Sequence, residues 1–296
     1  MEWWQAAILG LVEGITEYLP ISSTGHLIIT SALLGLDTPE TKSAVDAFNI
    51  VIQGGAILAV LGLYRQRVIQ MLKGLVGKDQ AGLRLALNII IAFMPAAILG
   101  VLFDDWIEAR LFYLWPVAGA LFVGGIYMIL VDRLRMARLR EDEKENPGKE
   151  HEFGLEQMNG FQALVIGLLQ CVAMWPGTSR SMMTITGGVL VGLRPKQAAE
   201  FSFLLGLPTL GGATVFKFYK NMTESAEAGE PNMIEVLGWG NLLIGIAVAT
   251  VSAMFAVKWL VGFLNKHGLA VFGYYRIALC ALLVALGLGG YVAFGP

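Results

Sequence analysis

Charged residues are scarce in this chain of 296 residues. Asp, Glu, Lys and Arg together make up 15% of it, whereas hydrophobic residues make up 56%. Soluble domains carry about 25% charged residues, so the chain has too few charges to cover a water-soluble protein of this length. The mean hydropathy of +0.64 points the same way. The composition excludes an ordinary soluble enzyme and a disordered chain, and it predicts one polytopic membrane domain.

The chain also has few cysteines and no excess of basic charge. The two cysteines, Cys171 and Cys280, lie in apolar stretches and are interpreted as small buried hydrophobic residues. This excludes a secreted domain held by disulfides. A formal net charge of -2 gives no basic field for nucleic acid. We expect no signal peptide at the N-terminus, because it has no basic region and Glu2, Glu13 and Glu17 interrupt the apolar run.

Long apolar stretches are abundant. Six of them can cross about 30 Å of hydrocarbon, at 47–64, 85–103, 111–131, 198–216, 236–262 and 269–294. Two further apolar regions, 3–36 and 160–193, are each interrupted by proline and hydroxyl residues, at Pro20–Thr24 and Pro176–Ser181. Broken helices are tolerated at membrane depth only where protein or a water-filled cavity covers the freed backbone. We therefore predict two re-entrant helical hairpins.

The two interrupted regions resemble each other. Gln5–Leu11 matches Gln162–Leu168, and after a gap of one residue Ser22–Thr24 aligns with Thr178–Arg180. This predicts an internal duplication, with repeat 1 at about 1–131, a cytoplasmic linker at 132–159 and repeat 2 at about 160–296. Each repeat would contain one hairpin and three spans. Because three is odd, the second repeat would be inverted, as in many secondary transporters. The predicted fold is an all-α polytopic membrane protein with an inverted-topology repeat.

Basic residues in the expected loops orient this topology. The loops at 65–84, 132–159, 194–197 and 263–268 share one side and hold fourteen lysines and arginines, against four on the other side. Basic residues accumulate in cytoplasmic loops. Both termini are therefore predicted to be periplasmic. Lys258 and Arg276 fall near span ends, where we interpret them as interfacial anchors.

Glu13 and Glu17 are candidate functional residues of the first hairpin. They are four residues apart and lie on one face of a helix. Carboxylates in an apolar helix are costly, and intramembrane ionisable groups are functional candidates by default. The pair can hold a divalent cation or transfer protons; the alternative is that both lie in water at the interface.

Hydroxyl groups and a histidine follow the first break. Ser22, Ser23 and Thr24 stand where a new helix begins, so free backbone N–H groups point toward the break. The hydroxyls can also serve as simple N-caps. His26 follows in the first turn, within reach of the hydroxyls and carboxylates. It is a candidate for acid–base catalysis, and a structural role is the alternative.

Arg180 lies at the second break, beside Thr178, Ser179 and Ser181. Arginine stays charged and binds phosphate with two parallel hydrogen bonds. Two facing helix N-termini and an arginine predict an anion site, most simply for phosphate; a purely structural ion pair is the alternative. Carboxylates near an anion favour a bridging divalent cation, Mg²⁺ or Ca²⁺, on Glu13 and Glu17.

The residues from Glu13 to His26, Glu-Gly-Ile-Thr-Glu-Tyr-Leu-Pro-Ile-Ser-Ser-Thr-Gly-His, resemble a signature of the bacterial undecaprenyl-diphosphate phosphatases of the bacitracin-resistance type. Pro176–Ser181 resembles the second signature, and Phe201–Leu205 and Tyr275-Arg276 are also similar to the family. The resemblance covers essentially the whole chain. One departure is Met182-Met183, where the family form has glycine and alanine, before Thr184.

The resemblance implies hydrolysis of undecaprenyl diphosphate to undecaprenyl phosphate and phosphate, which recycles the lipid carrier for peptidoglycan and confers bacitracin resistance. It also implies a divalent-cation requirement, a homodimer, and an active site open to the periplasm in the bacterial inner membrane. Partners would be the polyprenyl diphosphate and the bilayer, without nucleic acid. By motif, Glu13 and Glu17 are the acidic pair, Ser22, Ser23 and His26 the Ser-Ser-x-x-His group, and Thr178, Ser179 and Arg180 the phosphate-binding loop; within the Ser-Ser-x-x-His group, Ser22 is a candidate for phosphate binding.

These residues give a mechanistic hypothesis. Ser23 attacks the terminal phosphorus while His26 takes its proton and later activates water; Arg180, the N–H groups of the second hairpin and a cation on Glu17 and Glu13 neutralise the phosphates. In variants of this scheme His26 is the nucleophile, or the base for direct attack by water. Further phosphate-binding candidates are Thr24, Ser181 and Thr184. The alternative function is a transporter or flippase for undecaprenyl phosphate or another anion, using the same inverted-repeat cavity.

Overall fold

The computed structural model describes residues 1–36, 38, 42–111, 113–145, 147, 152–229 and 231–290. Residues 291–294, the end of the last expected span, lie outside this part. The described residues form helices throughout; the β-pairing among them is one isolated bridge between Phe153 and Leu193.

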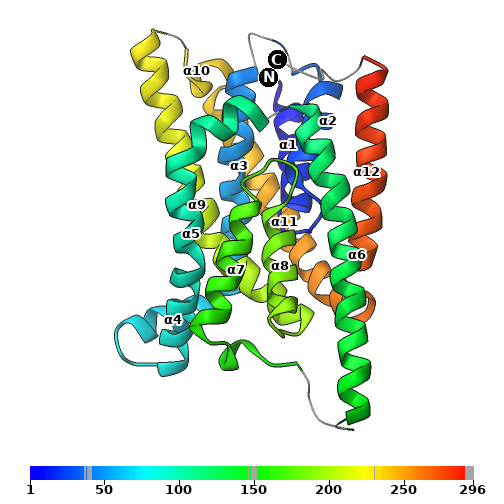
Figure 1. The fold of residues 1–296 in the computed structure, drawn as a ribbon. Helices are drawn as coiled ribbons and strands as arrows, with labels where there is room; N and C mark the ends of the chain where they lie inside the picture. The colour runs from blue at the N-terminus through cyan, green and yellow to red at the C-terminus, as the bar shows by residue number, and fades with distance from the viewer. Residues whose placement is uncertain are drawn as a thin grey trace.

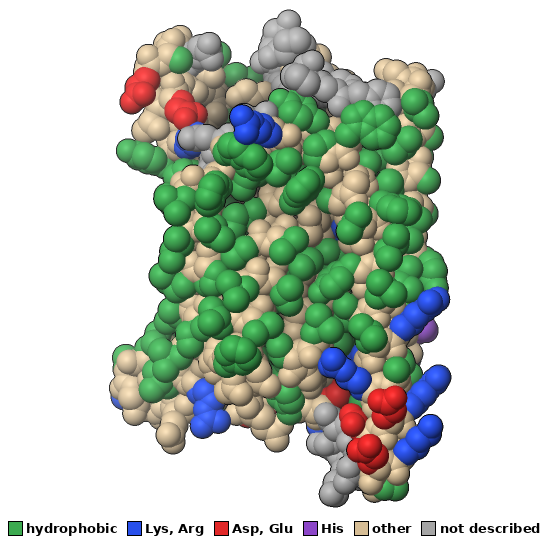
Figure 2. All heavy atoms as spheres, in the orientation of Figure 1, with side chains coloured by type: hydrophobic (Ala, Val, Ile, Leu, Met, Phe, Trp, Pro, Cys, Tyr) green, Lys and Arg blue, Asp and Glu red, His purple; other side chains and the backbone are tan. Residues whose placement is uncertain are grey.

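Six helices are long and apolar enough to cross a membrane, as the sequence predicts. They are α3 (Lys42–Leu63), α5 (Gln80–Leu111), α6 (Leu114–Glu145), α9 (Pro195–Ala228), α11 (Trp239–His267) and α12 (Ala270–Leu288). They stand side by side (Figure 1), and a broad apolar band separates charged side chains gathered near the two ends of the molecule (Figure 2). The chain is therefore a multi-pass membrane protein.

Two expected loops contain helices. The linker predicted at 132–159 begins as a continuation of α6 to Glu145, because its run of Arg, Glu and Lys combines high helix propensity with neighbouring opposite charges. The expected loop at 65–84 contains α4 (Arg65–Leu75), whose Arg67 donates to Glu200 of α9 at 2.7 Å and to Glu156 at 3.0 Å. The remaining short elements are η1 (Leu155–Gln157) and α10 (Met233–Leu237).

Both interrupted regions are pairs of short helices. The first pair is α1 (Trp3–Thr16) and α2 (Ser23–Leu33), and the second is α7 (Gly160–Val172) and α8 (Arg180–Leu190). They enter the molecule from opposite ends (Figure 1). Each is closed at its base by an equivalent hydrogen bond: Gln5 Nε2 donates to the Leu34 carbonyl at 3.0 Å, and Gln162 Nε2 to that of Val191 at 3.3 Å.

The turn of each hairpin ends at a serine in an unusual conformation. Ser22 caps α2 with φ 74°, and Ser179 caps α8 with φ 76°. A positive φ at a residue other than glycine costs on the order of 1–3 kcal/mol and persists only where the surroundings fix it. The two caps are 157 residues apart, as are Gln5 and Gln162. The gap of one residue expected from the sequence is therefore wrong: Ser22 pairs with Ser179 and Ser23 with Arg180.

One constant offset and matching contacts favour the predicted duplication. The order of elements is also repeated, since α1 to α6 and α7 to α12 each run short, short, long, short, long, long. The repeat boundaries at about 1–131 and 160–296 stay predictions.

Glycines let the first helix of each hairpin approach a spanning helix closely. A Cβ atom at Gly10 of α1 would lie 2.4 Å from the carbonyl oxygen of Gly245 in α11. At Gly167 of α7 it would lie 2.4 Å from the carbonyl oxygen of Ala92 in α5. Because the neighbour is backbone in both cases, a larger residue can be accepted only if the hairpin moves.

We predict that Gly10→Ala lowers the thermal unfolding midpoint of the detergent-purified protein by a few degrees, since overpacking costs about 1–3 kcal/mol. Gly119→Ala on α6 is the matched control, because a Cβ atom there has nothing within 4 Å. Alanine also favours a helix over glycine, so this control should keep or raise the midpoint. Equal midpoints for Gly10→Ala and the unsubstituted protein would contradict the packing argument.

Candidate active site

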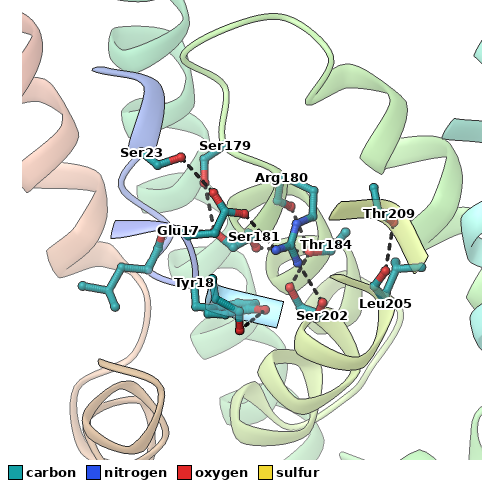
Figure 3. A network of polar contacts seen from close by, with 12 residues as sticks. Glu17, Tyr18, Ser23, Ser179, Arg180, Ser181, Thr184, Ser202, Leu205 and Thr209 are labelled. Atoms are coloured by element: carbon teal, nitrogen blue, oxygen red, sulfur yellow. Dashed lines mark hydrogen bonds and ion pairs between the residues drawn. The ribbon is translucent and has the colours of Figure 1, made fainter. Parts of the chain in front are cut away.

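The tips of the two hairpins meet in the interior. Ser181, fully buried at the start of α8, donates from Oγ to the Leu19 carbonyl of the first tip at 3.0 Å. Around this contact lie Glu17 from the first hairpin and Arg180 from the second (Figure 3). The fold thus brings together the two motifs that are far apart in the sequence.

Glu17 is the centre of the cluster, and both of its carboxylate oxygens are engaged. Oε2 accepts a hydrogen bond from Ser23 Oγ at 2.9 Å, and Oε1 accepts one from Arg180 Nη2 at 3.0 Å (Figure 3). The Glu17 and Arg180 side chains are only 7% and 9% exposed. A buried ion pair of this kind costs about 3–5 kcal/mol to break on one side, because the other charge is left uncompensated.

Arg180 is fixed from three directions. Nη1 donates to the Ser202 carbonyl at 2.8 Å, the guanidinium lies 5.5 Å from the centre of the Tyr18 ring, and Nη2 binds Glu17. Gly206 of α9 leaves room for the guanidinium, since a Cβ atom there would lie 3.0 Å from Nη1. Nε is buried and has no hydrogen-bond partner among the described residues, and each Nη group carries a second N–H. The arginine is positioned with unused capacity to bind an anion.

Two helix N-termini face the same cluster. Ser23 and Arg180 are the first residues of α2 and α8. The caps take up one backbone donor each: Ser22 Oγ accepts from Gly25 N at 3.4 Å, and Ser179 Oγ accepts from Met182 N at 3.2 Å. Other first-turn N–H groups have no partner within the helix, and the helix dipoles add partial positive charge. Helix N-termini of this kind bind anions in other proteins; anion binding at these two stays a prediction.

Glu13 lies one turn before Glu17 and is completely buried, and within the described part of the chain neither of its carboxylate oxygens has a hydrogen-bond partner. An orphaned buried carboxylate is suited to hold a cation. The described residues contain no group of three His, Cys, Asp or Glu side chains that could hold a metal alone. Mg²⁺ typically binds one or two protein carboxylates and completes its shell with water and substrate phosphates, so the Glu13–Glu17 pair fits a cation that binds together with a phosphorylated substrate.

His26 does not contact Ser23 through a hydrogen bond. Its Nδ1 lies 2.7 Å from the Ser22 carbonyl oxygen, so this nitrogen carries the proton and donates. Nε2 then accepts from the hydroxyl of Tyr275 on α12 at 2.7 Å, and the two rings stack with centroids 5.7 Å apart. Sequence reasoning did not include Tyr275 in the site, although the pair Tyr275-Arg276 is similar to the family.

Arg276 corrects a second expectation, because it is not an interfacial anchor. It is fully buried, and its Nη2 donates to the carbonyls of Ala120 at 3.0 Å and Gly177 at 2.8 Å. Gly177 is in the second tip with φ 89°, and a Cβ atom there would meet the backbone of Val117 in α6. Arg276 therefore ties the phosphate loop to α6 and α12.

The other predicted residues lie near the cluster with mainly structural contacts. Thr184 is buried, and its hydroxyl lies 2.6 Å from that of Ser202. Ser179 Oγ lies 3.0 Å from Ser181 Oγ, and Thr178 is buried in the tip. Thr24 is partly exposed in the first turn of α2. Phosphate binding by these residues stays a prediction.

Met182 and Met183 are both buried among core residues. The departure of the second motif from the family form is therefore accommodated by packing in the protein interior.

Comparison with known proteins supplies a family. A family model described as bacitracin resistance protein BacA matches residues 6–282. The chain is 46% identical to a Sorangium cellulosum protein named undecaprenyl-diphosphatase, over 97% of this chain and 87% of the relative. Proteins of the same name from Pseudomonas paraeruginosa and Porphyromonas gingivalis are 45% and 43% identical; the alignments cover 96% and 97% of this chain, and 95% and 97% of the relatives. With its two motifs joined at the hairpin tips, the chain belongs to the bacitracin resistance protein BacA family.

Proposed function

We propose that this protein is an undecaprenyl-diphosphatase, a membrane enzyme that hydrolyses undecaprenyl diphosphate to undecaprenyl phosphate and phosphate. The observation that carries this proposal is the Glu17 carboxylate, which holds a serine hydroxyl on one side and a buried arginine on the other, between two helix N-termini. A nucleophile, an anion-binding cation and a carboxylate base at one point are the parts that phosphoryl transfer requires. The names of the relatives support the same activity.

In the proposed first step, the terminal phosphate binds to Arg180 and the N–H groups at the start of α8. The hydroxyl of Ser23 attacks the terminal phosphorus, the bond from phosphorus to the bridging oxygen breaks, and undecaprenyl phosphate leaves. Because Ser23 donates to Glu17 and not to His26, Glu17 takes the serine proton in this scheme. Transfer of Arg180 from Glu17 to the phosphate makes the carboxylate a stronger base.

In the second step, water attacks the phosphorus of the phosphoserine, the bond from phosphorus to Ser23 Oγ breaks and phosphate is released, while Glu17 returns its proton to Ser23 Oγ. His26 lies three residues after Ser23 on the same face of α2, and its Nε2 can accept a proton once the Tyr275 hydroxyl gives way. His26 is therefore assigned the activation of water. Glu13 and Glu17 would hold the divalent cation, whose contribution would be to neutralise the diphosphate charge.

We further propose an orientation in the bacterial inner membrane. The N-terminus and the end of α12 lie at one end of the molecule, and α4 and the end of α6 lie at the other (Figure 1). The excess of basic residues in the loops of the second end supports a cytoplasmic location for it. The termini and the opening of the site would then face the periplasm. A homodimer is proposed from the family resemblance.

The alternative function is transport. Only the predicted inverted repeat favours it, because such repeats also occur in transporters. Release of phosphate by protein purified in detergent separates the two functions, because transport has no meaning without a sealed membrane. The clustered serine, carboxylates and histidine favour the enzyme.

We predict that Arg180→Ala lowers kcat/KM for undecaprenyl diphosphate by more than tenfold, at least about 1.4 kcal/mol in the barrier. Arg180→Lys should recover only part of the loss, because a point charge cannot bind phosphate with two parallel bonds. Phosphate release in detergent is the measurement. Arg138→Ala, which removes an exposed arginine of α6 away from the cluster, is the matched control. A rate for Arg180→Ala above a tenth of normal would remove this residue from the mechanism.

The serine-nucleophile scheme predicts a trapped intermediate. Rapid acid quenching of the enzyme with substrate labelled in the terminal phosphate should give acid-stable label on the peptide that contains Ser23. His26→Gln should increase the fraction of labelled enzyme, because the second step is slowed. Acid-labile label on His26, or near-normal turnover by Ser23→Ala, would replace this scheme with one of the His26 variants.

Cation dependence is a separate prediction. Chelation of divalent cations should abolish phosphate release, and Mg²⁺ or Ca²⁺ should restore it. Glu13→Gln, which keeps the shape of the side chain, should raise the cation concentration for half-maximal rate by at least tenfold, whereas Glu2→Gln at the start of α1 should leave it unchanged. If Glu13→Gln and the unsubstituted enzyme respond to the cation alike, Glu13 is not a ligand.

A further inference from the structure

A groove runs along the outside of the bundle beside the candidate active site. It encloses about 350 Å³ between α5, the tip of α7 and α9. Its walls are apolar, and the residues that form them include Phe93, Ala96, Gly100, Met174, Gly212 and Phe216. The volume is within the range of small-ligand sites. The two helices that flank it, α5 and α9, are both long and apolar enough to cross a membrane, and they lie on the same side of the molecule in Figure 1.

The inner end of the groove is the active-site arginine. Arg180 is in its lining, beside Thr209, whose hydroxyl lies 3.3 Å from Gln170 Oε1. In Figure 3, Arg180 lies between Ser23 on one side and Thr209 on the other. Nε of Arg180 is buried and has no hydrogen-bond partner among the described residues. The nucleophile, the arginine and the groove therefore follow one another in space.

The groove leads outward from Arg180 along α9 to Lys217. From Thr209 to Lys217 the helix rises about 12 Å. A molecule lying here meets a buried cation at the inner end and an apolar wall beyond it. This order fits an amphiphile whose anionic group is bound at Arg180 while its chain lies against the apolar side chains.

The same short sequence occurs in both halves of the chain, but it lines a groove in only one of them. Gly54-Gly55-Ala56 in α3 corresponds to Gly211-Gly212-Ala213 in α9 at the offset of 157 residues. A Cβ atom at Gly55 would lie 2.4 Å from the Ile246 carbonyl oxygen of α11, whereas one at Gly212 would have nothing within 4 Å. Gly55 is thus packed tightly against α11, whereas its counterpart Gly212 lines the open groove beside α5.

We propose that this groove binds the first isoprene units of the polyprenyl diphosphate substrate, with the diphosphate held at Arg180 and the chain leaving the protein between α5 and α9. The inference rests on the proposed function. An apolar chain gains free energy from burial against Phe93, Met174 and Phe216. It gains affinity only if its diphosphate is held at the same time, which distinguishes it from a bilayer lipid in the same place.

The test uses the full-length protein in detergent and a non-hydrolysable polyprenyl bisphosphonate with a photoreactive group on its second isoprene unit. After irradiation, mass spectrometry should find the label on α5 within 93–101 and on α9 within 209–217. Excess undecaprenyl diphosphate should remove it. Gly212→Leu fills the groove and should reduce labelling by at least tenfold. Gly262→Leu, at an exposed glycine of α11 with nothing within 4 Å of an added Cβ atom, should not.

The outcomes separate the two proposals. Label on α6, α12 or α2 would overturn the groove. So would equal, non-competed labelling by the matching prenyl alcohol, which would mean a general lipid site. Because the mapping uses the unsubstituted protein, it holds even if Gly212→Leu fails to fold. Phosphate release with label elsewhere rejects the groove alone; competed label in the groove without phosphate release rejects the phosphatase activity alone.

Discussion

The contact between Glu17 and Arg180 is the interaction on which the site depends. It joins two hairpins that enter the protein from opposite ends, and it is nearly closed to solvent. Neither buried charge can be left without a partner, because no other interaction would then offset the free-energy cost of removing it from water. The hairpins therefore have to meet in one register. Once they meet, the serine of one tip and the arginine of the other are held on the same carboxylate.

The register of the tips is fixed by features that are costly on their own. Two serines with positive φ, Ser22 and Ser179, turn the chain into α2 and α8, and the buried Arg276 binds the carbonyl of Gly177. Such strain and such a buried cation persist only where the surrounding structure fixes them. Here they aim two helix N-termini at one point. The tips therefore hold their backbone donors in place in advance, and preorganised donors of this kind are what phosphoryl transfer requires.

The two halves are alike in pattern and different in packing. The hairpins share their basal hydrogen bond and their serine caps, yet the carboxylate pair belongs to the first and the arginine to the second. Likewise, Gly55 is sealed against α11 whereas Gly212 faces an open groove. In a duplicated fold whose two halves pack differently, the diphosphate of the substrate can approach from water on one side while its prenyl chain leaves toward the membrane on the other. This asymmetry is what a lipid phosphatase needs and what a symmetric bundle would not supply.

The sequence by itself determined the membrane class, the six spans, the two broken hairpins and the residues of both motifs, because hydropathy, proline breaks and intramembrane charges are local signals. It did not determine the alignment of Ser23 with Arg180, since the cap conformations depend on the packing of both tips. The partnership of His26 with Tyr275, the burial of Arg276 and the groove along α9 were also decided only by the tertiary structure. Each of these depends on a helix more than 90 residues away in the chain or on the distance between two helices, and no local pattern encodes that distance.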